Sequence, residues 1–329
     1  MSAESGAADV SPTVTTHHDA AAPGAGIGGR AGSHVPAAAP SSAQPMPLPA
    51  ATGVPRRGRS GTTHRLFASE LALIFRRRRN LAGLGVLAVV PIIIAVAVKV
   101  SSGGPRGADF FADIAGNGMF VALAALTVEM PLFLPLAVAA IAGDSVAGEA
   151  NVGSLRFLLT APVGRSRLLA VKYAAVAVFS LSATLLVAVV GAIVGLALFP
   201  GSRMTMLSGQ QVSLLDGLGR TGLAVVYLSI GFAALGAIGL FISTLTEQPI
   251  GAMIAIVLLN VGMFIADAIP QLSWLAPWLL THWWTSFADL FRTPILWDNV
   301  ARGTITALVY LAIGYACAWA RFGSKDVTS

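Results

Sequence analysis

The sequence predicts an all-α integral membrane protein with six transmembrane helices. Of its 329 residues, 55% are hydrophobic and only 11% are charged, whereas soluble domains carry about 25% charged residues. A helical span needs about 20 apolar residues to cross a hydrocarbon layer of about 30 Å. Six runs meet this requirement, namely residues 81–100, 119–142, 168–198, 220–243, 249–269 and 302–321.

The distribution of Lys and Arg predicts the orientation of these spans. Nine precede the first span, four lie within 143–172 and two lie in the C-terminal tail, against five in the connections on the other side. Because Lys and Arg concentrate in cytoplasmic loops, both termini and the 143–167 loop are expected in the cytoplasm, with the chain in the cell membrane. The pI near 10.1 then reflects topology and anionic membrane lipid, and we expect no nucleic-acid partner.

The segment before the first span has two parts. Residues 1–62 are rich in Ala, Gly, Pro, Ser and Thr without periodic apolar residues, which predicts a disordered tail. In residues 63–79, THRLFASELALIFRRRR, one helical face carries apolar side chains, namely Phe67, Leu71, Ile74 and Phe75. This periodicity favours an amphipathic helix in the cytoplasmic interface; the alternative is a simple stop-transfer cluster of arginines.

Polar and helix-breaking residues interrupt three of the spans. Pro91 is expected to kink the first span, and Pro131 and Pro135 lie in the second. The second span also contains Glu129, and Asn260 lies near the middle of the fifth. A charge at the centre of a span costs about 2.5–3.5 kcal/mol on insertion scales, so such residues are candidates for function.

Residues 266–301, before the last span, are too long and too apolar for a plain loop. Three prolines divide this connection, and it contains five of the six tryptophans: Trp274, Trp278, Trp283, Trp284 and Trp297. Indole rings prefer the headgroup layer of a membrane. We therefore predict one or two short re-entrant or interfacial helices on the outer face, with His282 as an interface residue rather than a metal ligand.

The most polar interruption lies between the second and third spans and reads GDSVAGEANVGSLRFLLTAPVGRSRLLAVK (143–172). Val152, Leu155 and Leu159 share one helical face, and Pro162 ends the helix. A helix of several turns here predicts a contact surface for a cytoplasmic partner. The alternative is an interfacial loop helix whose arginines reach the headgroups.

No catalytic signature is present in the sequence. It contains no HExxH, GxSxG or paired-Cys metal spacing, and no GxxxxGK[ST] loop for ATP hydrolysis. The five histidines are scattered. The sequence therefore favours a non-enzymatic chain without a metal or cofactor of its own.

At this point the residues resemble a known family. The run Glu149…Gly153-Ser154-Leu155…Leu158-Leu159…Pro162-Val163…Arg165…Lys172 is similar to the cytoplasmic loop of type-2 ATP-binding-cassette (ABC) exporter permeases. That loop commonly reads Glu, Gly-Thr-Leu, a Leu pair, Pro-Val-Ser-Arg and a later Gly-Lys. Residues 65–79 resemble the N-terminal elbow helix of these permeases. The resemblance covers about residues 63–325, leaving 326–329 as a short tail. This chain departs from the pattern at Ala150, Ser154, Gly164 and Val171.

The resemblance implies a transport mechanism. Two permease chains, identical or different, would pair with two separate P-loop ATPase subunits, which bind the ATP and Mg²⁺. The region 143–162 would be a coupling helix on the ATPase, and the residues implied in coupling are Glu149, Gly153, Leu155, Arg156, Leu159, Pro162 and Arg165.

Three of the polar residues have alternative roles. In the family the second and fifth spans line the pathway, which makes Glu129 and Asn260 candidate pathway residues; the alternative is that they are satisfied between helices or near the outer surface. Glu149 either contacts the ATPase or caps a helix start.

Other classes of function stay open at this stage. A secondary transporter would show an internal repeat and discontinuous helices near the midplane, and no clear repeat is present. A membrane-bound enzyme and a structural membrane subunit are further alternatives. The sequence does not identify the transported substrate, and it does not distinguish a homodimer from a heterodimer.

Overall fold

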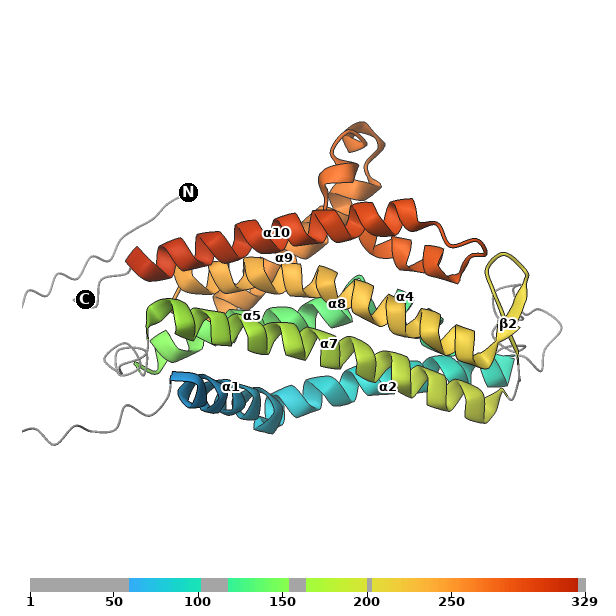
Figure 1. The fold of residues 1–329 in the computed structure, drawn as a ribbon, viewed down its shortest axis with the longest axis horizontal. Helices are drawn as coiled ribbons and strands as arrows, with labels where there is room; N and C mark the ends of the chain where they lie inside the picture. Colours follow the sequence, from blue (N-terminus) through green and yellow to red (C-terminus); the bar gives the residue numbers. More distant parts are fainter. Residues whose placement is uncertain (1–58, 102–117, 154–163, 200–202, 325–329) are drawn as a thin grey trace, which may run out of the picture. The chain divides into compact units, whose positions relative to one another are not determined.

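Helices dominate the computed structural model of the chain, which describes residues 59–101, 118–153, 164–199 and 203–324. All of these residues belong to one unit, Pro55–Ser329, drawn in Figure 1. Among these described residues, six helices are long and apolar enough to cross a membrane, which is typical of a multi-pass membrane protein. They are α2 (Arg78–Ser101), α5 (Phe133–Asn151), α7 (Arg165–Leu198), α8 (Leu214–Leu245), α9 (Pro249–Ala268) and α10 (Trp297–Ser324).

The amphipathic helix before the first span is present as α1 (Arg59–Arg76). It begins within the segment that was expected to be a disordered tail, so that the boundary at residue 62 is wrong by about one helical turn. Its apolar side chains Ile74 and Phe75 pack against the core, with the Phe75 ring 6.0 Å from the ring of Phe179 on α7. A location in the membrane interface stays a prediction.

The second predicted span, 119–142, is not one helix. It consists of α4 (Phe120–Glu129) and α5, with a break at residues 130–132. The break follows from two prolines spaced by four residues, Pro131 and Pro135, because proline has no backbone N–H to donate to the carbonyl four residues earlier. The predicted end at residue 142 is also wrong, since α5 continues to Asn151.

Small residues bring α4 and α7 into close contact. A Cβ added to Gly191 would lie 2.7 Å from the Cα of Ala122, and a Cβ added to Gly195 would overlap the carbonyl of Gly118. The Gly191 and Gly195 pair therefore allows a close helix contact. The two helices run antiparallel in this contact, because Gly118 pairs with Gly195 and Ala122 pairs with Gly191.

Helix α8 is the most deeply buried of the six spanning helices. It contacts α5, α7, α9 and α10, and Leu228 and Phe232 are fully buried in the core that these helices share. Gly236 and Gly239 on α8 lie against Val176 and Ala142. The core therefore forms around α8.

A short hairpin joins α7 to α8. Its strands are β1 (Arg203–Thr205) and β2 (Gln211–Ser213), paired antiparallel with Arg203 opposite Ser213. The hydroxyl of Ser213 accepts a hydrogen bond from the backbone N–H of Asp216 and so caps the start of α8. The hairpin lies at the opposite end of the helices from α1 (Figure 1).

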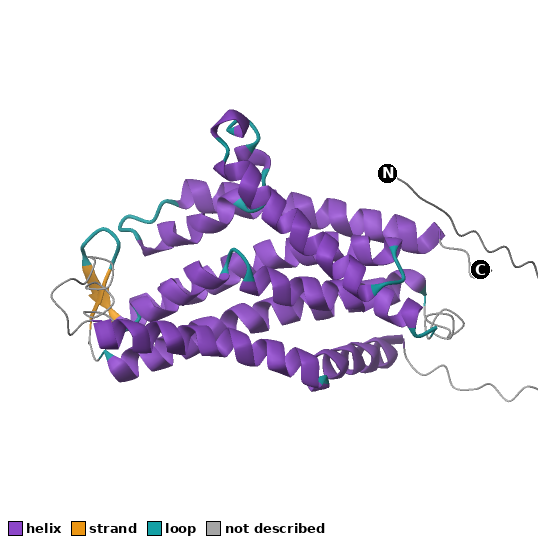
Figure 2. Cartoon of the chain, turned by 180° about the vertical axis from the view of Figure 1, so that it is seen from behind, coloured by secondary structure: helices purple, strands orange, loops and turns teal. Residues whose placement is uncertain are grey.

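The connection between α9 and α10 contains three short 3₁₀ helices, η1 (Pro270–Leu272), η2 (Ala276–Trp278) and η3 (His282–Phe291). Figure 2 shows the part with η1 and η2 projecting from the side of the helices, where Trp274 and Trp278 are about 70% exposed. Segment η3 instead packs on α8 and α10. Trp284 departs from the prediction for the tryptophans, because it is 2% exposed and lies against Phe232 and Phe264.

Candidate functional site

Charged side chains gather where α1, α2, α5 and α7 meet. This cluster, called here the charged junction, borders a cavity of about 160 Å³. It lies near the end of the helices at which α1 and α7 begin and α5 and α10 end (Figure 1). Its charged members are Glu70, Arg77, Arg79, Asp144, Glu149 and Lys172, and the neutral amide of Asn80 lies beside them.

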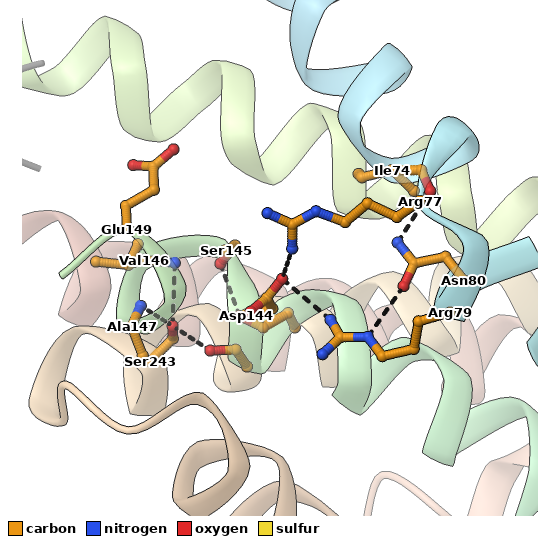
Figure 3. A network of polar contacts seen from close by, with 12 residues as sticks. Ile74, Arg77, Arg79, Asn80, Asp144, Ser145, Val146, Ala147, Glu149 and Ser243 are labelled. Carbon is orange, nitrogen blue, oxygen red and sulfur yellow. Dashed lines mark hydrogen bonds and ion pairs between the residues drawn. The ribbon is translucent and has the colours of Figure 1, made fainter. Parts of the chain in front are cut away.

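Asp144 on α5 binds two arginines of the predicted elbow segment. It forms ion pairs with Arg77 and, at 3.1 Å, with the Nη2 of Arg79, as Figure 3 shows. Beside them, the side-chain amide of Asn80 donates to the carbonyl of Ile74 at 2.9 Å, which satisfies a carbonyl in the last turn of α1. These contacts fix the turn between α1 and α2 against α5.

Lys172 on α7 is the centre of the charged junction. Its side chain is 1% exposed, and its Nζ lies 3.1 Å from Glu70 Oε1 on α1 and 2.5 Å from Glu149 Oε1 on α5. A buried ammonium group requires such partners, because a charge removed from water without compensation is very costly. One lysine therefore joins three helices.

The end of α5 is also anchored to α8. The hydroxyl of Ser243 donates to the carbonyl of Gly143 at 2.8 Å and accepts from the backbone N–H groups of Val146 and Ala147 (Figure 3). Gly143 itself lies against the backbone of Met253 on α9, with only 2.9 Å between an added Cβ and the Met253 nitrogen. A displacement of the α5 end would therefore act on α8 and α9 as well.

The structure revises the predicted coupling region 143–167. Residues 143–151 are the last turns of α5 and not part of a separate loop helix. Glu149 lies in the last turn of α5, so the alternative that it caps a helix start does not hold, and contact with an ATPase stays a prediction. Gly153 follows with a φ of 72°, a left-handed conformation that favours glycine.

Arg165 is the one predicted coupling residue after Gly153 that lies in the described part of the chain. Arg165 begins α7, and its Nη1 donates to the carbonyl of Gly323 near the end of α10 at 3.1 Å. Four of the predicted coupling residues lie outside the described residues, namely Leu155, Arg156, Leu159 and Pro162.

The two candidate pathway residues both lie at the break between α4 and α5. The side-chain amide of Asn260 donates to the carbonyl of Pro131 at 2.9 Å. Glu129, the last residue of α4, is 0% exposed, and Asn260 is 1% exposed. Within the described residues, neither carboxyl oxygen of Glu129 nor Oδ1 of Asn260 has a hydrogen-bond partner. In the single chain both side chains lie between helices and reach no surface.

An apolar groove of about 550 Å³ runs between α2, α5 and α9. Its walls include Leu87, Leu136 and Met253, and Arg79 and Asp144 of the charged junction border it. The groove is therefore lined mostly by apolar side chains, and its charged edge lies on the side of the predicted elbow helix.

Sequence reasoning missed Asp144, Ser243 and the partners of Lys172. Asp144 and Glu149 had a usable signal, since they are acidic residues just beyond an apolar run in a chain with an arginine cluster before its first span. Lys172 stands among apolar residues near the start of a span, where a cation needs a partner. Nothing in the sequence around Ser243 indicates its role, because that role depends on how α8 packs against α5.

The outer connection brings one further pair together. His282 Nδ1 lies 2.7 Å from Asp267 Oδ1, at the point where α9 ends. Among the described residues, no group of three or more His, Cys, Asp or Glu side chains is placed to hold a metal ion.

These features define a mostly helical, multi-pass membrane protein with a charged junction at one end of its spans. Residues 88–328 match the family described as "Protein of unknown function (DUF2705)", and the chain belongs to this family. A comparison with curated proteins gave no match.

Proposed function

We propose that the chain is the permease subunit of an ABC transporter, acting in export with a second permease chain and a separate P-loop ATPase. The observation that supports this most directly is the position of Lys172, which pairs with both α1 and α5 from the start of α7. The segment between α5 and α7 is the one that resembles the coupling loop. A force on this segment therefore acts at once on three helices.

The proposed coupling is mechanical. ATP and Mg²⁺ are bound by the partner ATPase, and closure of that subunit moves the segment between Asn151 and Arg165. The end of α5 carries this motion to α8 through Ser243 and to α1 through Lys172. The ion pairs of Asp144 with Arg77 and Arg79 carry it to the start of α2.

The groove between α2, α5 and α9 supports a pathway along the second and fifth spans. Its lining is mostly apolar, and the exposed face of α9 beside it carries Ile250, Ile254 and Leu258. We propose that a second permease chain faces this side, so that the pathway forms between the two chains in the cell membrane. In this arrangement the termini lie in the cytoplasm.

One observation favours a second candidate function, that of a secondary transporter. Discontinuous helices near the midplane of the membrane are typical of such proteins, and the α4–α5 break with buried Glu129 is a discontinuity of this kind. We rank it second because no internal repeat is evident in the sequence.

The test is purification of the tagged chain from its native cells in mild detergent, followed by mass spectrometry. We expect a P-loop ATPase in stoichiometric amount. The double variant Leu155→Asp and Leu159→Asp should lose the ATPase while still inserting into the membrane. Leu215→Asp, at an exposed residue near the opposite end of the helices, is the matched control and should retain it.

Repeated recovery of intact protein without an ATPase, under conditions where known transporter complexes survive, would overturn the ABC proposal. Transport by the chain alone in vesicles would then favour the secondary transporter.

A further inference from the structure

Glu129 combines a fully buried carboxyl group with a break in a spanning helix. It is the last residue of α4 and is 0% exposed. Neither of its oxygens has a hydrogen-bond partner in the part of the chain that the structure describes. Its charge state is therefore set by its surroundings.

The neighbouring face of α7 is polar but uncharged. Gly118 lies against Gly195 and Ala122 against Gly191. Glu129 follows Ala122 by seven residues, or about two helical turns, and Thr184 precedes Gly191 by the same number. Because the two helices are antiparallel, Glu129 lies at the same level as Thr184. Thr184 and Ser180 are both 0% exposed, and their hydroxyls donate to carbonyls of α7 itself. They supply no charge to Glu129.

The charged groups of the surrounding helices lie far from this level. On α7, Lys172 is about 18 Å along the helix from Thr184, and it is held by Glu70 and Glu149. The charged residues of α2 stand at its two ends, and Asp144 and Glu149 lie in the second half of α5. Asp267 of α9 is paired with His282. Among the described residues, no cation compensates Glu129.

We propose that Glu129 is a proton-binding site, and that the break at residues 130–132 is the hinge that controls its access to water. An ionised carboxylate without a partner is strongly disfavoured in such a place, whereas the neutral acid is tolerated. Buried acids in membrane segments commonly serve as sites on proton pathways. In the packing described here, Glu129 carries its proton.

Proton release requires the hinge to open. The O–H bond of the carboxylic acid breaks, the proton passes to water and the electron pair stays on the carboxylate. Because Pro131 and Pro135 have no backbone N–H, helix α5 is not continuous with α4. The hydrogen bond from Asn260 to Pro131 holds the break against α9, and its opening would let α4 move relative to α5.

Infrared spectroscopy of the purified full chain in lipid nanodiscs tests proton binding directly. We expect the carbonyl stretch of a protonated carboxylic acid at neutral pH in the wild type. The band should be absent in Glu129→Gln and retained in Glu247→Gln, a control that removes an exposed acid. A wild-type spectrum without this band overturns the proposal, and so does a band that persists in Glu129→Gln.

Hydrogen–deuterium exchange of the same band tests the hinge. Transfer to deuterated buffer shifts the band when the acid exchanges, and the shift should be slow in the wild type. In Asn260→Leu it should be about tenfold faster, as expected when one hydrogen bond of ordinary net strength is lost. An equal rate in both proteins overturns the hinge. None of these outcomes depends on an ATPase partner. A negative result for proton binding therefore leaves the proposed transport function untouched, and the absence of an ATPase partner leaves proton binding untouched.

Discussion

Asn260 on α9 donates its side-chain amide to the carbonyl of Pro131, 2.9 Å away, in the break between α4 and α5. In a continuous helix the N–H of residue 135 would bond to this carbonyl, but residue 135 is a proline and has no N–H to give. A neighbouring helix supplies the missing donor, which is how proline is tolerated in membrane helices. The asparagine in the fifth span and the two prolines in the second thus form one structural unit.

The first prediction concerns this unit. Asn260→Leu should destabilise the protein by about 1–3 kcal/mol, because it leaves a buried carbonyl unpaired. Pro135→Ala restores a backbone N–H at the position that a continuous helix would use, so the loss caused by Asn260→Leu should be smaller in the Pro135→Ala background. Thermal unfolding in nanodiscs measures both effects. Equal losses in the two backgrounds would contradict the explanation.

The second prediction concerns the charged junction. Lys172→Met should destabilise the fold by about 3–5 kcal/mol, because Glu70 and Glu149 would remain as partly buried carboxylates without their cation. Unfolding in detergent measures the loss. The triple variant Glu70→Gln, Glu149→Gln and Lys172→Met should recover much of it, since no charge is then left unpaired. A triple variant as unstable as Lys172→Met would show that the lysine acts through packing instead.

The third prediction concerns the contact of α4 with α7. Gly195→Ala should cost about 1–3 kcal/mol, because the added methyl group would overlap the carbonyl of Gly118 and force the helices apart. The matched control is Gly83→Ala on α2, where an added Cβ meets no atom within 4 Å. It should be neutral or slightly stabilising, since alanine is the better helix former. Melting temperatures that fall equally in the two variants would refute the close contact.

The fourth prediction concerns orientation. In a Cys317→Ser background, which removes the single native cysteine, a cysteine at Gln210 in the hairpin should react with a membrane-impermeant maleimide on intact cells. A cysteine at Val152, which is 79% exposed after α5, should react only after permeabilisation. The reverse pattern would show that the excess of Lys and Arg does not set the orientation of this chain.

The apolar runs were enough to locate five of the six spanning helices of the described residues, because hydrocarbon thickness imposes length and composition directly on the sequence. They did not locate the end of α5. The fall in hydropathy after residue 142 marks a change in surroundings, whereas a helix ends only where its backbone geometry changes, here at Gly153 with its left-handed conformation. Hydropathy alone therefore predicts a loop at residues 143–151, although they continue α5.

The polar contacts were harder to predict than the spans. Lys172 and Glu70 are separated by about a hundred residues in the sequence, and their pairing depends on how α1 packs against α7. Pro131, Pro135 and Asn260 were all noted in the sequence, but nothing local indicates that the asparagine faces the break. Polar residues in apolar spans indicate that a partner exists, and the partner is identified only by the fold.

The contacts of α10 with the start of α7 carry a consequence for biosynthesis. Arg165 binds the carbonyl of Gly323, and the indole N–H of Trp319 donates to the hydroxyl of Ser166 at 2.8 Å. Ribosomes make α7 long before the last residues of α10, so these bonds form only after α10 has left the ribosome. A nascent chain therefore holds α7 without these two bonds until α10 is made, and products that end before α10 never acquire them.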